Sequence, residues 1–173
     1  MSKTALIVID VQNDYFPEGA FPLADTDSTL AAIELAIKNA QSAKMPVVIV
    51  QHIADTNAGV APFFNRGTVG ADIHPHILQL APDAPIVVKH YADSFEQTTL
   101  ADTLTHLEVN ELVLCGMMTQ NCVTHTALSR EADRYKSVTV FTDATTTVSP
   151  LLHAIALHAL STRVRLVPVA EMF

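Results

Sequence analysis

Six short runs of apolar residues recur along the chain. They occupy residues 4–9, 47–50, 85–88, 111–115, 137–142 and 164–167. Most are rich in Val and Ile, and they show little alternation of apolar with polar positions. That pattern is typical of parallel strands that are buried on both faces of a sheet. We therefore expect six strands in one parallel sheet.

Helical periodicity separates most of these runs. A helix is predicted from Asp27 or Ser28, either of which is a suitable N-cap, to about Lys44. Three further helices are predicted over residues 98–107, 121–135 and 150–160. Alternating strands and helices predict an α/β fold, a Rossmann-like three-layer sandwich with helices on both faces. Its six-stranded parallel sheet is expected in the order 3-2-1-4-5-6.

Two long segments, residues 11–26 and 53–84, have no sustained periodicity and are rich in Pro, Gly, Asn and Asp. Loops of that length inside a compact domain are usually functional. Four aromatic candidates for a substrate pocket or a subunit contact fall within them: Phe16, Phe21, Phe63 and Phe64.

The composition narrows the class of protein. A chain of 173 residues with 49% hydrophobic and 16% charged residues is expected to form a single globular domain, residues 1–173. Its net charge of −8 argues against binding to nucleic acid or to an anionic membrane surface. No apolar run approaches the ~20 residues that span a bilayer, and none resembles a signal peptide, so a cytoplasmic location is expected.

Polar side chains stand where the predicted strands end. Asp10 follows the first strand, His52 the second and Lys89 the third, while Cys122 lies just beyond the fourth. Ligands of such sheets bind at the carboxyl ends of the strands. A carboxylate can take the proton of a thiol, and an ammonium group favours the thiolate. These residues together therefore indicate a nucleophilic cysteine, although each alone is as ordinary as a buried Cys, a strand-ending Asp or a surface Lys.

The position of Cys122 at a strand-to-helix junction predicts a thiolate, because a helix N-terminus carries partial positive charge. Cys115 ends a buried strand, and a disulfide between the two is possible but disfavoured in a reducing compartment. His125 follows three positions after Cys122, which directs it along the helix and disfavours a Cys–His dyad.

Several motifs in one order resemble the isochorismatase-like cysteine hydrolases, a family that includes nicotinamidases and N-carbamoylsarcosine amidase. The matching segments are residues 5–16, 67–75, 88–95 with Thr98 and Leu100, 116–123, and 143–144. The resemblance covers nearly the whole chain. It implies a catalytic triad of Asp10, Lys89 and Cys122. In this triad Asp10 accepts the thiol proton and later activates water, and Lys89 holds the other two groups.

The resemblance also implies the chemistry of the turn before Cys122. Cys122 would attack a carbonyl carbon and form a thioester-type acyl enzyme. A cis peptide bond is expected between Met117 and Met118. The N–H groups of Met118 and Cys122 would then form an oxyanion hole, in which one donor is typically worth ~10²-fold or more in rate.

Metal binding is not expected. Nicotinamidases of this family hold a metal through an Asp-x-His pair and a later His, whereas here Asp55 is followed two positions on by Asn57. His52, Asp55, His74 and His76 lack a compact ligand pattern, so we predict neither a metal nor a cofactor. Isochorismatases proper lack the cysteine, which disfavours that activity here.

The sequence thus predicts a cysteine-dependent amidohydrolase whose partners are a small amide, carbamoyl or ureido substrate and water. A homo-oligomer is expected, since members of the family commonly form one. The alternatives are a metal-dependent nicotinamidase, an enzyme for a different acyl or ester substrate, and a non-catalytic oligomeric relative that retains the triad.

Overall fold

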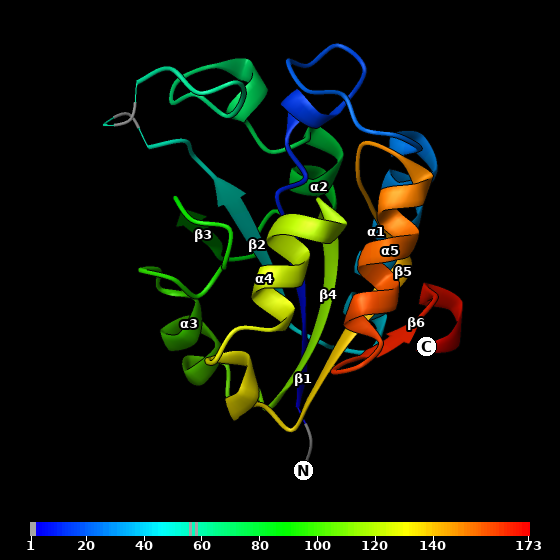
Figure 1. Cartoon of the computed structure of the whole chain (residues 1–173). Coiled ribbons are helices and arrows are strands. Elements are labelled where there is room, and N and C mark those ends of the chain that lie inside the picture. The colour runs from blue at the N-terminus through cyan, green and yellow to red at the C-terminus, as the bar shows by residue number, and fades with distance from the viewer. Residues whose placement is uncertain (1–2, 56, 58) are drawn as a thin grey trace.

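A computed structural model describes residues 3–55, 57 and 59–173. Its sheet has six parallel strands in the order β3-β2-β1-β4-β5-β6, which confirms the predicted α/β topology (Figure 1). The strands are β1 (Thr4–Ile9), β2 (Val47–His52), β3 (Ile86–Lys89), β4 (Glu111–Met117), β5 (Ser137–Thr146) and β6 (Arg165–Val167).

Among the residues that the structure describes, five α-helices and five short helical turns have defined bounds. The helices are α1 (Thr26–Ser42), α2 (Pro75–Leu80), α3 (Leu100–His106), α4 (Thr124–Ala127) and α5 (Pro150–Leu160). The short turns are η1 (Asn13–Tyr15), η3 (Val69–Ala71), η4 (Thr119–Val123), η5 (Ala132–Arg134) and η6 (Val169–Glu171). None of the described helices is long and apolar enough to cross a membrane.

Side chains of β1 alternate between two apolar cores, one on each face of the sheet. Leu6 and Val8 belong to a core that α1 and α2 complete. Ile7 and Ile9 belong to the opposite core, which α3, α4 and α5 complete. In Figure 1, α4 and α5 lie in front of the sheet and α1 lies behind it. Because both faces are covered, β1 carries apolar residues at nearly every position, as the sequence pattern predicted.

Three helical predictions are wrong. The N-cap predicted at Asp27 or Ser28 is Asp25, and α1 begins at Thr26. The helix expected over residues 121–135 is interrupted, because η4 forms a π turn before α4 and α4 ends at Ala127. The Oγ of Ser129 then accepts a hydrogen bond from the Glu131 N–H (3.2 Å), a local bond that competes with helical pairing. The segment 53–84 also contains α2, whose signal was Pro75 at its first position.

The two long loops pack together over the carboxyl end of the sheet. Asp14 joins them, because its Oδ2 accepts from the Phe64 N–H (2.7 Å) and its Oδ1 from the Ala20 N–H (3.0 Å). Gly70 lies against the same carboxylate, and a Cβ atom there would overlap it. These contacts fix the walls of the region where the strands end.

Candidate active site

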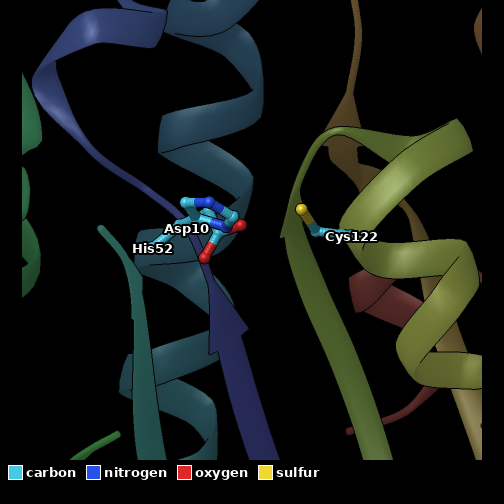
Figure 2. Close-up of side chains that lie close together, drawn as sticks. All are labelled: Asp10, His52 and Cys122. Atoms are coloured by element: carbon cyan, nitrogen blue, oxygen red, sulfur yellow. The ribbon is translucent and has the colours of Figure 1, made fainter. Parts of the chain in front are cut away.

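The structure brings the predicted triad together at the carboxyl ends of β1, β3 and β4. Asp10 directly follows β1, Lys89 ends β3, and Cys122 lies in η4 after β4. Figure 2 shows Asp10 and His52 side by side, with the Cys122 sulfur facing them from the neighbouring turn. One polar atom from each of these three side chains lies within 4.8 Å of the other two.

The Lys89 ammonium group occupies the centre of this cluster. Its Nζ lies 2.8 Å from Asp10 Oδ2, 2.9 Å from His52 Nδ1, 3.0 Å from the Tyr91 carbonyl oxygen and 3.2 Å from Cys122 Sγ. Burial by itself lowers the pKa of Lys89, but the negative charge of Asp10 and the hydrogen bonds to Asp10 and Cys122 outweigh burial and raise it. Lys89 is therefore a charged residue with no solvent exposure, held by its neighbours.

Cys122 rests as a thiol. Burial raises its pKa above the usual range, the charge of Asp10 raises it further, and Lys89 only partly opposes them. The prediction of a resting thiolate is therefore wrong. The sequence placed Cys122 at a helix N-terminus, which would lower the pKa of the thiol. However, η4 and α4 are short and Cys122 is only 2% exposed, so burial has the larger effect on its pKa. Removal of the proton must accompany catalysis.

Asp10 is placed by an uncommon backbone conformation. Its φ of 51° is in the left-handed region, which Asp tolerates better than most residues. Its N–H donates to the Val50 carbonyl (3.0 Å), and its own carbonyl accepts from the Gln12 N–H (3.0 Å). The buried Oδ1 has no hydrogen-bond partner among the described residues. This oxygen is therefore available to a thiol proton, a water molecule or a substrate N–H group.

The turn between β4 and Cys122 has a fixed geometry. Gly116 has φ 116°, and a Cβ atom there would overlap the Ile9 carbonyl oxygen, so β4 approaches β1 closely just before Asp10. The peptide bond between Met117 and Met118 is cis. The Met118 carbonyl then accepts from the Asn121 N–H (3.0 Å) and the Val123 N–H (3.3 Å).

The side chain of Thr119 ties this turn to α5. Its hydroxyl lies 2.8 Å from His153 Nδ1, and its carbonyl accepts from the Thr124 hydroxyl (2.6 Å). Thr119 is fully buried, and burial lowers the pKa of His153.

The second cysteine takes no part, because Cys115 is buried and its Sγ lies 3.7 Å from the Ile7 carbonyl oxygen.

Three of the four predicted aromatic pocket residues form one cluster. Phe21, Phe63 and Phe64 surround Tyr15, whose ring centroid lies 6.4, 5.4 and 4.5 Å from theirs, respectively. Phe16 does not join them. It packs on the His74 ring at 4.4 Å and lines a separate cavity of about 590 Å³.

Tyr15 is a site residue that the sequence did not identify. It is 1% exposed, and its pKa is raised by burial first and then by the charges of Asp10 and Asp14. The phenol is therefore neutral and close enough to the triad to interact with its charges. The sequence signal for Tyr15 was its position next to Asp14 in the segment 5–16, the first of the segments that resemble the family.

The side chains considered as metal ligands are scattered. His76 Nδ1 lies 2.7 Å from Glu34 Oε1, and His74 Nδ1 accepts from the His76 N–H at the start of α2. Asp55 Oδ1 accepts from the Asn57 N–H (2.9 Å). Of the four candidate ligands His52, Asp55, His74 and His76, only His52 lies beside the triad, with its Nδ1 2.9 Å from Lys89 Nζ.

Asp10, His52 and Cys122 are residue types that can bind a transition metal. The Lys89 ammonium, however, lies within 3.2 Å of a polar atom from each of them. It fills the space that a cation would need and repels it. The arrangement therefore fits a buried ammonium group and does not fit a metal ion.

The isochorismatase domain model matches residues 4–171. The chain belongs to the isochorismatase family. It is 38% identical to the uncharacterized isochorismatase family protein YddQ of Bacillus subtilis, over 73% of this chain and 68% of that protein. It is 30% identical to a probable inactive nicotinamidase of Arabidopsis thaliana, over 87% of this chain and 84% of that protein.

A solved structure has the same fold. The putative isochorismatase hydrolase of Oleispira antarctica superposes with a TM-score of 0.86 at 31% sequence identity, covering 99% of this chain and 96% of that one. Family membership identifies an isochorismatase-family hydrolase, and the proximity of Cys122 to Lys89 suggests a cysteine hydrolase.

Proposed function

We propose that this isochorismatase-family protein hydrolyses a small amide, carbamoyl or ureido compound through a covalent acyl-thioenzyme. The observation that carries the proposal is the buried cluster of a thiol, a carboxylate and an ammonium group. The Asp10 carboxylate has an oxygen within 4.8 Å of the Cys122 sulfur, and its buried Oδ1 has no hydrogen-bond partner among the described residues. A thiol with a raised pKa needs a base at the moment of attack, and Asp10 is that base.

In the acylation step Asp10 removes the Cys122 proton while Sγ forms a bond to the substrate carbonyl carbon. The carbonyl electron pair moves to oxygen, where the N–H groups of Met118 and Cys122 would bind it. Asp10 then delivers the proton to the leaving nitrogen, the C–N bond breaks, and ammonia or an amine departs. Lys89 balances the negative charge that moves between Asp10 and Cys122, since it contacts both.

In the second step Asp10 removes a proton from water, whose oxygen bonds to the acyl carbon. The C–S bond of the resulting tetrahedral species breaks, and the proton returns to the Cys122 sulfur. A carboxylic or carbamic acid leaves the site. Water and one substrate suffice, so the cycle balances without a cofactor.

Tyr15 and the phenylalanines packed on it are the reason to expect a substrate whose acyl group is small and partly apolar. Phe64 links this cluster to the catalytic centre, because its ring lies 5.9 Å from that of His52. Oxyanion donors and an apolar wall are compatible with an aromatic amide as well as with a ureido compound. The class of substrate therefore has to be decided by assay.

The direct test is ammonia release from a panel of nicotinamide, pyrazinamide, carbamoylated amino acids, biuret and ureidoacrylate. We expect at least one member to be hydrolysed by the wild-type protein. Neither Cys122→Ala nor Asp10→Asn should hydrolyse it. Activity that depends on added metal and is lost with EDTA would favour the metal-dependent nicotinamidase.

A non-catalytic role is the second candidate, and a specific similarity favours it. One relative with 30% identity is a probable inactive nicotinamidase. Under this alternative no amide or ester on a broad panel is turned over, although the protein is folded. Hydrolysis of esters but not of amides would instead indicate a different acyl substrate.

Self-association is a further part of the proposal. Helices α4 and α5 pack side by side. Four exposed apolar side chains lie on α5, just before it or just after α4: Leu128, Val148, Leu151 and Ile155. Light scattering should therefore give a mass that is a multiple of 18.7 kDa, reduced by Leu151→Ser with Ile155→Ser. A wild-type monomer at high concentration would contradict this.

A further inference from the structure

His52 is the fourth side chain of the catalytic cluster, and the steps above give it no task. It is the last residue of β2, and the parallel register pairs it directly with Lys89 of β3. This pairing brings His52 Nδ1 to 2.9 Å from Lys89 Nζ. Figure 2 shows its imidazole lying next to the Asp10 carboxylate.

The main chain of His52 is clamped by the side chain of Gln12. Gln12 Nε2 donates to the His52 carbonyl (2.8 Å), and the His52 N–H donates to Gln12 Oε1 (2.7 Å). Gln12 is fully buried, and its Nε2 also donates to the Ala71 carbonyl (2.7 Å). The end of β2 is therefore fixed relative to Asp10, which lies two positions before Gln12.

The contact with Lys89 fixes the protonation state of His52. An ammonium group has donors only, so Nδ1 must carry a lone pair and the ring proton must be on Nε2. Burial lowers the pKa of His52 to about 4, Lys89 and His90 lower it as well, and Asp10 opposes them. Cys122, from η4, is the remaining titratable group of the cluster. The imidazole is thus neutral near neutral pH.

Counting the protons of Lys89 shows what this neutral acceptor does. An ammonium group has three N–H bonds. Four acceptors lie within reach of Nζ, namely His52 Nδ1, the Tyr91 carbonyl oxygen, Asp10 Oδ2 and Cys122 Sγ, so at least one N–H must be shared. If His52 Nδ1 and the Tyr91 carbonyl oxygen each hold one N–H, one N–H remains for Asp10 Oδ2 and Cys122 Sγ together.

We propose that His52 is a positioning residue that fixes the rotation of the Lys89 ammonium group, so that a single N–H is shared between the base and the nucleophile. This inference rests on the proposed function for its effect on turnover. Without the Nδ1 acceptor, a second N–H of Lys89 turns to Asp10 or Cys122. A carboxylate that accepts an additional charged hydrogen bond is a weaker base, and a thiolate that accepts one is a weaker nucleophile, so attack on the substrate slows.

Two substitutions separate positioning from space filling. His52→Leu removes the acceptor, whereas His52→Asn places Oδ1 near the position of Nδ1. We expect His52→Leu to lower kcat roughly tenfold, the scale of one hydrogen bond to a charged group, with little change in KM. His52→Asn should recover most of kcat. His106→Asn is the matched control, because His106 is exposed on α3 and its Nδ1 bonds only the Asp102 carbonyl.

The alkylation of Cys122 gives a readout that needs no substrate. The pH at which half-maximal alkylation by iodoacetamide occurs should fall in His52→Leu, because the released N–H of Lys89 stabilises the thiolate. It should stay near the wild-type value in His52→Asn. Equal losses of kcat in the Leu and Asn variants, or unchanged kcat and alkylation profile in His52→Leu, would overturn the proposal.

Nitrogen-15 NMR of the wild-type protein tests the same claim without any substitution, and so guards against a variant that fails to fold. The His52 Nδ1 resonance should be that of an unprotonated nitrogen at neutral pH, with the proton on Nε2. A protonated Nδ1 would contradict the inference. If the wild-type protein hydrolyses nothing on the panel, the proposed function fails. The NMR and alkylation results still decide whether His52 Nδ1 accepts a hydrogen bond from Lys89 and orients its ammonium group.

Discussion

Replacing Lys89 with methionine should destabilise the protein strongly, because it leaves a buried carboxylate without its counter-ion. Asp10 and Lys89 form an ion pair of 2.8 Å in which neither side chain is exposed. Removing one partner of such a buried pair typically costs about 3–5 kcal/mol, a large part of the stability of a domain of this size. The loss should appear as a lower urea midpoint followed by far-ultraviolet circular dichroism.

The double variant Asp10→Asn with Lys89→Met locates the origin of that loss. With the carboxylate neutralised, the buried charge is gone, so most of the lost free energy of unfolding should return. The control is Lys3→Met, since Lys3 pairs with Glu108 at 3.7 Å on the surface, where a pair is worth at most about 1 kcal/mol. A loss below about 1 kcal/mol for Lys89→Met would refute a buried ion pair at this position.

Three more predictions follow from the same geometry. Gly116→Ala should cost about 2 kcal/mol or more in the free energy of unfolding, because φ is positive and a Cβ would overlap the Ile9 carbonyl; a midpoint within error of wild type would contradict this close approach. Cys122→Ala should abolish turnover while lowering the free energy of unfolding by no more than about 1–3 kcal/mol, and turnover by this variant would contradict the role of the thiol. Alkylation of Cys122 should be slow at neutral pH and accelerate as pH rises, since its pKa is raised, while Cys115 should react only on unfolding; a rate that does not change with pH would indicate a resting thiolate.

The positions of β1 and β2 were predictable because both faces of the sheet are covered. Burial on both sides requires apolar residues at nearly every strand position, so β1 and β2 stand out as runs of Val and Ile. The extent of α4 was not predictable from periodicity. Its apolar spacing continues past Ala127, but the Ser129 side chain bonds the main chain locally and the helix stops.

The charged residues of the candidate site could be found from their positions, but their states could not. Asp10 and Lys89 each follow or end an apolar run, which marks them as residues at the carboxyl edge of the sheet. The raised pKa of Cys122 depends on how completely the fold buries it, and no local pattern encodes that burial. The contact of His52 with Lys89 depends on the register between β2 and β3, which a single sequence does not specify.

The central claim is that Cys122 forms a covalent bond with the acyl group of the substrate. The most direct measurement is mass spectrometry of protein quenched in acid during turnover of whichever panel compound is hydrolysed, followed by peptide mapping. We predict an added mass equal to the acyl group on the peptide that contains Cys122, and no adduct in Cys122→Ala. Continued turnover by Cys122→Ala, with no adduct on the wild-type peptide, would contradict the account.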